Sequence, residues 1–128
     1  MTLGEGMEDI FRLCDVVRET AFDIHRYLRS GHFEKVYENA LAHRLRSKGL
    51  KVDPQHQLLV RDEDGTVLGH YVADLLIEGV LLVEVKASVT LGSADTAQIL
   101  GYLRASGLRH GLPVNFGAQR LQIQKFIV

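Results

Sequence analysis

The sequence predicts an α/β sandwich in which helices flank a central mixed sheet. In the N-terminal third, apolar residues recur at helical spacing, and in the middle they form β-type runs separated by turn residues. A third helical segment then separates these runs from two apolar runs at the C-terminus. With 128 residues, 46% of them hydrophobic, we expect residues 1–128 to form a single domain.

Two helices are expected at the N-terminus. The first runs from Glu8 to about Ser30, where apolar side chains stand three or four residues apart until Gly31 breaks the pattern. The second runs from about Phe33 to Lys48 and is followed by Gly49, a frequent C-terminal stop. The rest of the chain is expected to form, in order, strands at 50–61, 66–77 and 81–87, a right-handed crossover helix at 93–106, and strands at 112–116 and 121–128.

Three charged residues interrupt the most apolar hairpin of the sequence. Asp74 lies in the strand before the Glu78-Gly79 connection, and Glu84 and Lys86 end the strand after it. Taken alone, they are explained by a surface ion cluster in which the lysine neutralises the two acids. They also fit a metal site, and the rest of the chain must decide between these interpretations.

The register of the hairpin decides whether the two acids meet. A two-residue turn would leave Asp74 and Glu84 on opposite faces of the sheet. A three-residue loop pairs Ile77 with Leu81 and sets Asp74 opposite Glu84, with Gly79 able to supply a positive φ. We predict this register or an equivalent bulge.

Facing carboxylates repel each other, and a bound cation would reverse that effect. Oxygen ligands on two strands suit Mg²⁺ or Mn²⁺ better than zinc, which prefers cysteine and histidine. Lys86, two residues beyond Glu84, emerges on the same face and could stabilise developing negative charge.

The charges are segregated along the chain although the net charge is only −1. Residues 25–51, 52–84 and 85–128 carry net charges of +5, −6 and +4. An acidic centre between basic segments suits a metal site bordered by phosphate contacts. An ordinary solvated helix face explains the basic residues equally well: Arg44, Arg46, Lys48 and Lys51.

The sequence favours a cytoplasmic protein. Its apolar runs are far shorter than a membrane span, and the acidic N-terminus lacks a signal-peptide pattern. The only cysteine, Cys14, follows the apolar spacing of the first helix, so we expect it to be buried and reduced.

The order of elements, with Asp74, then Glu84-Val85-Lys86, then Gln98 and Tyr102 on the next helix, resembles the PD-(D/E)XK nuclease superfamily. Within it, the spacing of Gly31, Glu34 and Tyr37 matches the signature of the GxxExxY family, and 115–117, Asn-Phe-Gly, looks like a further family position. The resemblance covers about residues 10–128.

This resemblance implies a restriction-endonuclease-like αβββαβ core with an extra N-terminal helix. It implies that Asp74, Glu84 and the carbonyl of Val85 bind Mg²⁺ or Mn²⁺, with Lys86 as the catalytic basic residue. Gln98 could orient water or a phosphate.

The superfamily often adds an acid from the first core helix. Glu34 and Glu38 stand one helical turn apart on one face, so both remain candidates.

Two hypotheses follow. The first is a divalent-metal-dependent nuclease that hydrolyses phosphodiester bonds of DNA or RNA. The second is a catalytically silent protein that keeps the nuclease fold for nucleic-acid binding or self-assembly, which the near-neutral charge and small size favour. We consider a homo-oligomer under either hypothesis, by analogy with other small nuclease domains.

Overall fold

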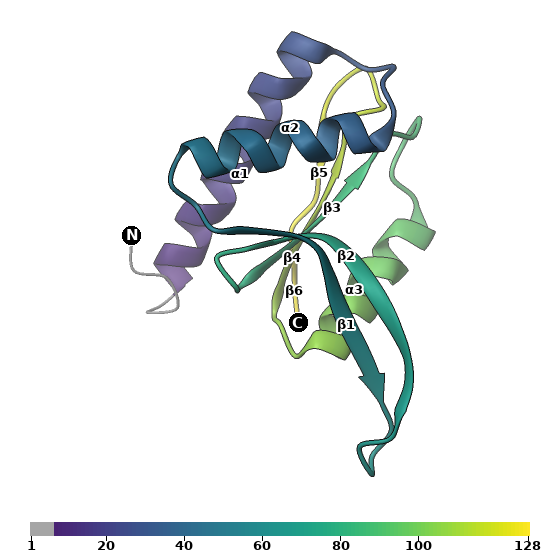
Figure 1. Cartoon of the computed structure of the whole chain (residues 1–128). Coiled ribbons are helices and arrows are strands. Elements are labelled where there is room, and N and C mark those ends of the chain that lie inside the picture. Colours follow the sequence, from purple (N-terminus) through teal and green to yellow (C-terminus); the bar gives the residue numbers. More distant parts are fainter. Residues whose placement is uncertain (1–6) are drawn as a thin grey trace.

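The chain folds around a mixed sheet with helices on both faces (Figure 1). The computed structural model describes residues 7–128, and the N-terminal stretch considered above for a signal peptide, residues 1–6, lies outside them. The elements are, in chain order, α1 (Met7–Leu28), α2 (Glu34–Ser47), β1 (Val52–Arg61), β2 (Val67–Ile77), β3 (Leu81–Lys86), α3 (Ser93–Ser106), β4 (His110–Asn115), β5 (Gln122–Ile123) and β6 (Phe126–Ile127).

The strands pair in the order β1-β2-β3-β4, and β5 and β6 both pair with the outer edge of β4. Strands β3 and β4 are parallel and are joined through α3, whereas the other pairs are antiparallel. The predicted fold class, an α/β architecture with a central mixed sheet, is therefore confirmed.

Each face of the sheet has its own apolar core. Helices α1 and α2 cover one face, against which Leu81, Val83 and Val85 of β3 are buried. Helix α3 covers the other face, which receives Leu82. Because side chains alternate along a strand, Glu84 and Lys86 follow Leu82 onto the α3 face.

Helix α3 lies close over β4 because Gly111 leaves room for it. A Cβ atom at Gly111 would stand 2.8 Å from Cγ1 of Ile99, closer than carbon atoms pack. This close approach holds the middle of the crossover helix against β4, the parallel neighbour of the strand that carries Glu84 and Lys86.

Helix α1 is amphipathic, as its spacing predicts. Leu13, Val17 and Ile24 are fully buried, and Cys14 is buried among them as a free thiol. Within residues 7–128, no helix combines the length and the apolarity needed to cross a bilayer.

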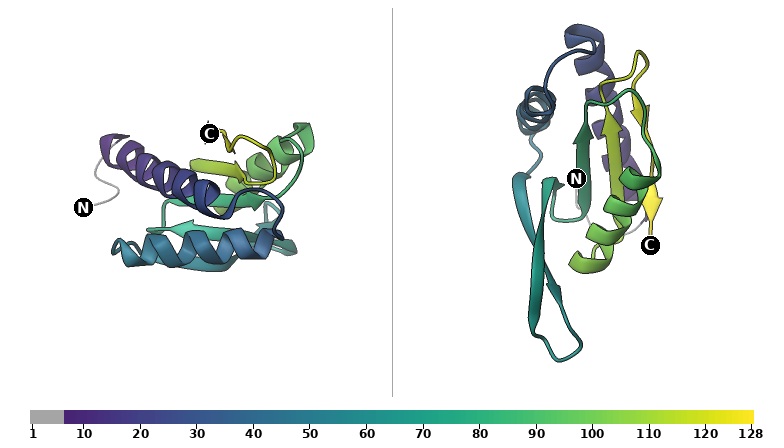
Figure 2. Two further views of the ribbon diagram at one scale, coloured as in Figure 1. Left: turned by 90° about the horizontal axis from the view of Figure 1, so that it is seen from above. Right: turned by 90° about the vertical axis from the view of Figure 1, so that its right-hand side faces the viewer.

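Strands β1 and β2 form a long hairpin that projects beyond the rest of the fold, as Figure 1 and the right-hand view of Figure 2 show. Its outer half carries exposed apolar side chains, among them Leu59, Val67 and Leu68. We call residues 56–71 the hairpin arm.

Most predicted boundaries differ from the observed ones by one or two residues, and two of the differences have a clear structural cause. Helix α1 ends at Leu28 because Arg29 takes a positive φ of 60°. The last strand, predicted as one run, is divided into β5 and β6 although both keep one register on β4. The interruption lies opposite Pro113, which has no N–H to donate, so only the Gln124 N–H to Pro113 carbonyl bond of 3.3 Å remains there.

Candidate active site

The β2–β3 hairpin has the predicted register, and it opens where the acids stand. Ile77 pairs with Leu81 across a three-residue loop, and the ladder ends at Leu75 and Val83. The loop takes positive φ angles at Glu78 as well as at Gly79, 52° and 71°. Beyond the ladder β2 turns away into the hairpin arm while β3 continues beside β4, so the two strands form a fork.

Asp74 and Glu84 occupy the base of this fork. The backbone N–H of Asp74 donates to Oε1 of Glu84 at 3.0 Å, and the N–H of Val85 donates to Oδ2 of Asp74 at 2.7 Å. Each carboxylate thus accepts a main-chain bond from the opposite strand. These bonds fix both side chains at the point where the strands separate.

Both acids resist ionisation. Burial, followed by the nearby charge of Asp74, raises the pKa of Glu84 from its ordinary value of 4.5 to about 8. Burial also raises the pKa of Asp74. The hydrogen bond from the N–H of Val85 lowers this pKa, and the negative charge of Glu38 raises it further. Two carboxyl groups that repel each other in a buried site become favourable ligands once a divalent cation is present.

Glu38, and not Glu34, is brought into this cluster. Glu38 is buried, 5% exposed, and accepts hydrogen bonds from Lys35 Nζ at 2.7 Å and from Gln55 Nε2 at 3.0 Å. Glu34 is exposed in the first turn of α2. Of the two acids that the sequence left open, only Glu38 acts electrostatically on Asp74.

Lys86 lies on the α3 side of the fork. Its Nζ donates to Oε1 of Gln98 and stands 3.8 Å from Oδ1 of Asp95, and Nε2 of Gln98 donates to the hydroxyl of Tyr102 at 3.1 Å. Asp95 also accepts the N–H of Gly92 at 2.9 Å, which caps α3. The start of α3 therefore sets the position of the ammonium group.

Val85 can serve the site only through its main chain. Its side chain is buried on the α1–α2 face, and its N–H is already bonded to Asp74. Among residues 7–128, no three His, Cys, Asp or Glu side chains are arranged to hold a metal ion together. A cation held by the carboxylates of Asp74 and Glu84 would therefore need main-chain or solvent oxygens as further ligands.

Tyr37, the last residue of the Gly31, Glu34 and Tyr37 spacing, has a structural role at the turn between α1 and α2. The hydroxyl of Tyr37 donates to the carbonyl of Arg29 and accepts from the N–H of His32 at 3.2 Å. Its ring stacks on Phe116 with centroids 4.7 Å apart. Tyr37 is fully buried and packs in the core.

Asn115 was predicted only as a family position, but its side chain connects the segment after Lys86 to the segments that follow β4. Its Oδ1 accepts the N–H groups of Ser88 and Gly117, both at 3.0 Å, and its Nδ2 donates to the carbonyl of Ser88 and to Gln122, both at 2.9 Å. A Cβ at Gly117 would lie 2.4 Å from the backbone of Ala87. The sequence does contain one indication of this role, because Asn115 is a polar residue within the apolar run 112–116.

The basic residues of α2 mostly have structural contacts. Arg46 donates to the carbonyl of Val52 at 2.9 Å, Lys48 Nζ donates to Thr20 at 2.6 Å, and the guanidinium of Arg44 lies 5.9 Å from the ring centroid of Tyr27. These contacts favour the solvated-face interpretation for these three residues.

The family assignment rests on a match over most of the chain. The family model described as the PD-(D/E)XK nuclease superfamily matches residues 12–126. The chain belongs to the PD-(D/E)XK nuclease superfamily. Asp74, Glu84 and Lys86 are the residues of this chain that correspond in type and order to the motif for which the superfamily is named.

A solved structure has a similar fold. The crystal structure of SSO0001 is similar with a TM-score of 0.54 and 18% sequence identity, over 73% of this chain and 48% of that one. This PD-(D/E)XK chain thus spans about half the length of the structure it matches. No curated protein matches significantly.

Proposed function

We propose that this PD-(D/E)XK protein is a divalent-metal-dependent nuclease that hydrolyses phosphodiester bonds of DNA or RNA. The observation that carries the proposal is the fork, where Asp74 and Glu84 face each other with raised pKa values and Lys86 stands beside them. Buried acids whose pKa values are raised in this way, close to a fixed cationic group, are candidates for a functional site.

Asp74 and Glu84 would hold Mg²⁺ or Mn²⁺, together with the carbonyl of Val85. Hard oxygen donors are what these ions prefer. When bound, the ion would supply Lewis-acid stabilisation and a more acidic water. Glu38 would act from the α2 side, where it adds negative charge near Asp74.

The residues of the chain supply orientation and charge. Lys86 carries a positive charge on the same face as Glu84, where it would stabilise the negative charge that develops on phosphorus-bound oxygens. Gln98 holds Nζ of Lys86 from α3 and keeps it from turning fully onto the acids. Lys35 and Asn39 line a groove of ≈ 530 Å³ next to Glu38, where a phosphate of the substrate would meet the amino group of Lys35.

The test is a nuclease assay with a matched lysine control. The protein should degrade single-stranded or duplex DNA or RNA with Mg²⁺ or Mn²⁺ and not with EDTA, and Lys86→Ala should lower the rate at least about 100-fold. Lys51→Ala removes the same charge from an exposed side chain and should leave the rate unchanged. Equal rates for wild type and Lys86→Ala would refute the proposal, provided that circular dichroism shows both to be folded.

A catalytically silent nuclease fold is the second candidate. The hydrogen bonds within the site favour this function, because they already occupy the groups that would act on a substrate. Lys86 donates to Gln98, and each carboxylate accepts a main-chain N–H. Three results together would establish this function: calorimetry detects no binding of a divalent metal, no nucleic-acid substrate is cleaved, and light scattering shows a defined oligomer. Under either function we further propose membership of the GxxExxY family, on the spacing of Gly31, Glu34 and Tyr37.

A further inference from the structure

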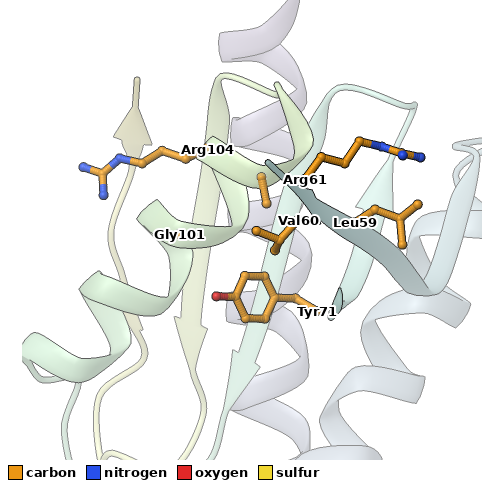
Figure 3. Close-up of a pocket in the computed structure, with 7 residues that line it drawn as sticks. Leu59, Val60, Arg61, Tyr71, Gly101 and Arg104 are labelled. Carbon is orange, nitrogen blue, oxygen red and sulfur yellow. The ribbon is translucent and has the colours of Figure 1, made fainter. Parts of the chain in front are cut away.

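A groove between the hairpin arm and α3 lies next to the fork. It has a volume of ≈ 370 Å³. Val60 of β1 and Tyr71 of β2 lie on the side that faces α3, and Leu59 and Arg61 lie at the outer edge. Helix α3 contributes Gly101, Arg104 and Ala105. Figure 3 shows the ring of Tyr71 below the two arginines, whose guanidinium groups extend away from it to opposite sides.

Aromatic contacts connect this groove to the candidate active site. The ring of Tyr71 lies 5.0 Å from that of Tyr102, centroid to centroid. The hydroxyl of Tyr102 accepts from Gln98, which in turn accepts from Lys86. Tyr71 also precedes Asp74 by three residues on β2, a distance of about 10 Å along a strand.

The groove has the chemistry of a site for unpaired nucleotides. Tyr71 is backed by Tyr102 on one side and is 44% exposed, so it offers a supported aromatic surface to an incoming base. Arg61 and Arg104 place positive charge on two sides of the groove, and none of the described residues that line it is a carboxylate. Arg61 donates to the carbonyl of Gly65 at 3.0 Å, and within residues 7–128 no carboxylate forms an ion pair with it.

We propose that this groove binds the single-stranded part of a nucleic-acid substrate, with a base on Tyr71 and phosphates at Arg61 and Arg104. The inference rests on the proposed function and names its substrate class. An offset of about 10 Å from Asp74 corresponds to about three nucleotides at the 3.4 Å rise of a stacked strand. The bound base would therefore lie about three nucleotides from the bond to be cleaved.

The charges on the hairpin arm determine the direction in which the bound nucleic-acid strand leaves the groove. The tip of the arm carries Asp62, Glu63 and Asp64, all exposed, which repel phosphate. The strand therefore leaves the groove across α3, past Arg104, and does not follow the arm to its tip. A base-paired duplex would not present a free base face to Tyr71, because its bases are already stacked.

Gly101 allows the groove to be filled without disturbing the fold. A Cβ built at Gly101 meets no atom within 4 Å. The residue lies inside α3, and leucine and alanine both have a higher helix propensity than glycine. Gly101→Leu should therefore block the groove in a folded protein, whereas Gly101→Ala adds only a methyl group. These two variants separate loss of the site from loss of the fold.

The experiment is fluorescence anisotropy in EDTA, so that binding is measured without cleavage. The probes are a labelled 12-nucleotide oligothymidylate, an oligouridylate of equal length, and a DNA duplex. We expect the wild type to bind one or both single strands at least about tenfold more tightly than the duplex. Tighter binding of the oligothymidylate would identify the substrate as DNA, and tighter binding of the oligouridylate would identify it as RNA.

The variants should rank by what they remove. Tyr71→Ala and Gly101→Leu should weaken single-strand binding about tenfold, whereas Tyr71→Phe and Gly101→Ala should stay within about twofold of wild type. Arg104→Ala should weaken binding and reduce the slope of log affinity against log salt by about 0.7. Arg26→Ala and Tyr27→Ala on α1, which packs on the other face of the sheet, are the controls and should bind as wild type.

The outcomes separate this inference from the proposed function. If the protein cleaves nucleic acid but Tyr71→Ala and Gly101→Leu bind as tightly as wild type, the groove is not the site and the nuclease proposal stands. If the variants behave as expected but no cleavage occurs with any metal, the groove stands and the nuclease proposal fails. Absence of binding to all three probes, or tighter binding of the duplex, would overturn the inference.

Discussion

Replacing Glu84 by glutamine should stabilise the metal-free protein at alkaline pH. The pKa of Glu84 is raised from 4.5 to about 8 in the folded protein, chiefly by burial. The folded state therefore holds a proton that the unfolded chain has released, and unfolding becomes easier as the pH rises between these two values. Asp74, whose pKa is also raised, contributes with the same sign.

The size of the effect follows from the two pKa values. For Glu84 alone, linkage gives a fall of about 3 kcal/mol in the free energy of unfolding between about pH 5.5 and about pH 8. Glutamine stays neutral over this range, and its amide oxygen can still accept the N–H of Asp74. Glu84→Gln should therefore unfold at higher urea than wild type at pH 8, and the two should differ little at pH 5.5.

Urea denaturation followed by circular dichroism, in EDTA at both pH values, measures this directly. Glu63→Gln is the control, because Glu63 is exposed at the tip of the arm and its replacement makes the same change in charge. If wild type is equally stable at the two pH values, or if Glu84→Gln keeps the full pH dependence, the electrostatic description of the fork is wrong.

Three further predictions concern the site and its support. At pH 8, Mn²⁺ at about 100 times its Kd should raise the unfolding free energy of wild type by about 2.7 kcal/mol in the same urea assay, and should have little effect on Glu84→Gln. Glu38→Gln should lower nuclease activity about tenfold or more in a Mg²⁺ assay, whereas Glu34→Gln, on an exposed side chain one turn away, should not; the reverse order would exchange their roles. Asn115→Ala removes four hydrogen bonds from a fully buried side chain and should cost about 3 kcal/mol in thermal or urea unfolding, and a cost below about 1 kcal/mol would show that Asn115 does not brace the chain after Lys86.

The hairpin could be predicted from the sequence because its constraints are local. Side-chain alternation and loop length leave few registers, and only one of them sets Asp74 opposite Glu84. The pairing of Ile77 with Leu81 confirms that register. The contact between Gln98 and Lys86 is less local, and the helical spacing of Gln98 and Tyr102 predicted only that these two share a face.

Other features depend on how distant segments pack. Glu34 and Glu38 point to similar sides of an isolated helix, and only the placement of α2 over the sheet buries Glu38 beside Gln55 and leaves Glu34 in solvent. Asn115 is bonded to Ser88, 27 residues away, which no local pattern encodes. The groove at Tyr71 likewise forms only when the hairpin arm meets α3.

The central claim is that a divalent cation binds between Asp74 and Glu84, and a crystal grown with Mn²⁺ tests it most directly. The anomalous difference map should show a peak between the two carboxylates, with oxygen ligands at about 2.1 to 2.2 Å, and no peak in Glu84→Gln grown under the same conditions. A map without a peak there in wild type, at Mn²⁺ concentrations that saturate any stabilisation in solution, would contradict the claim.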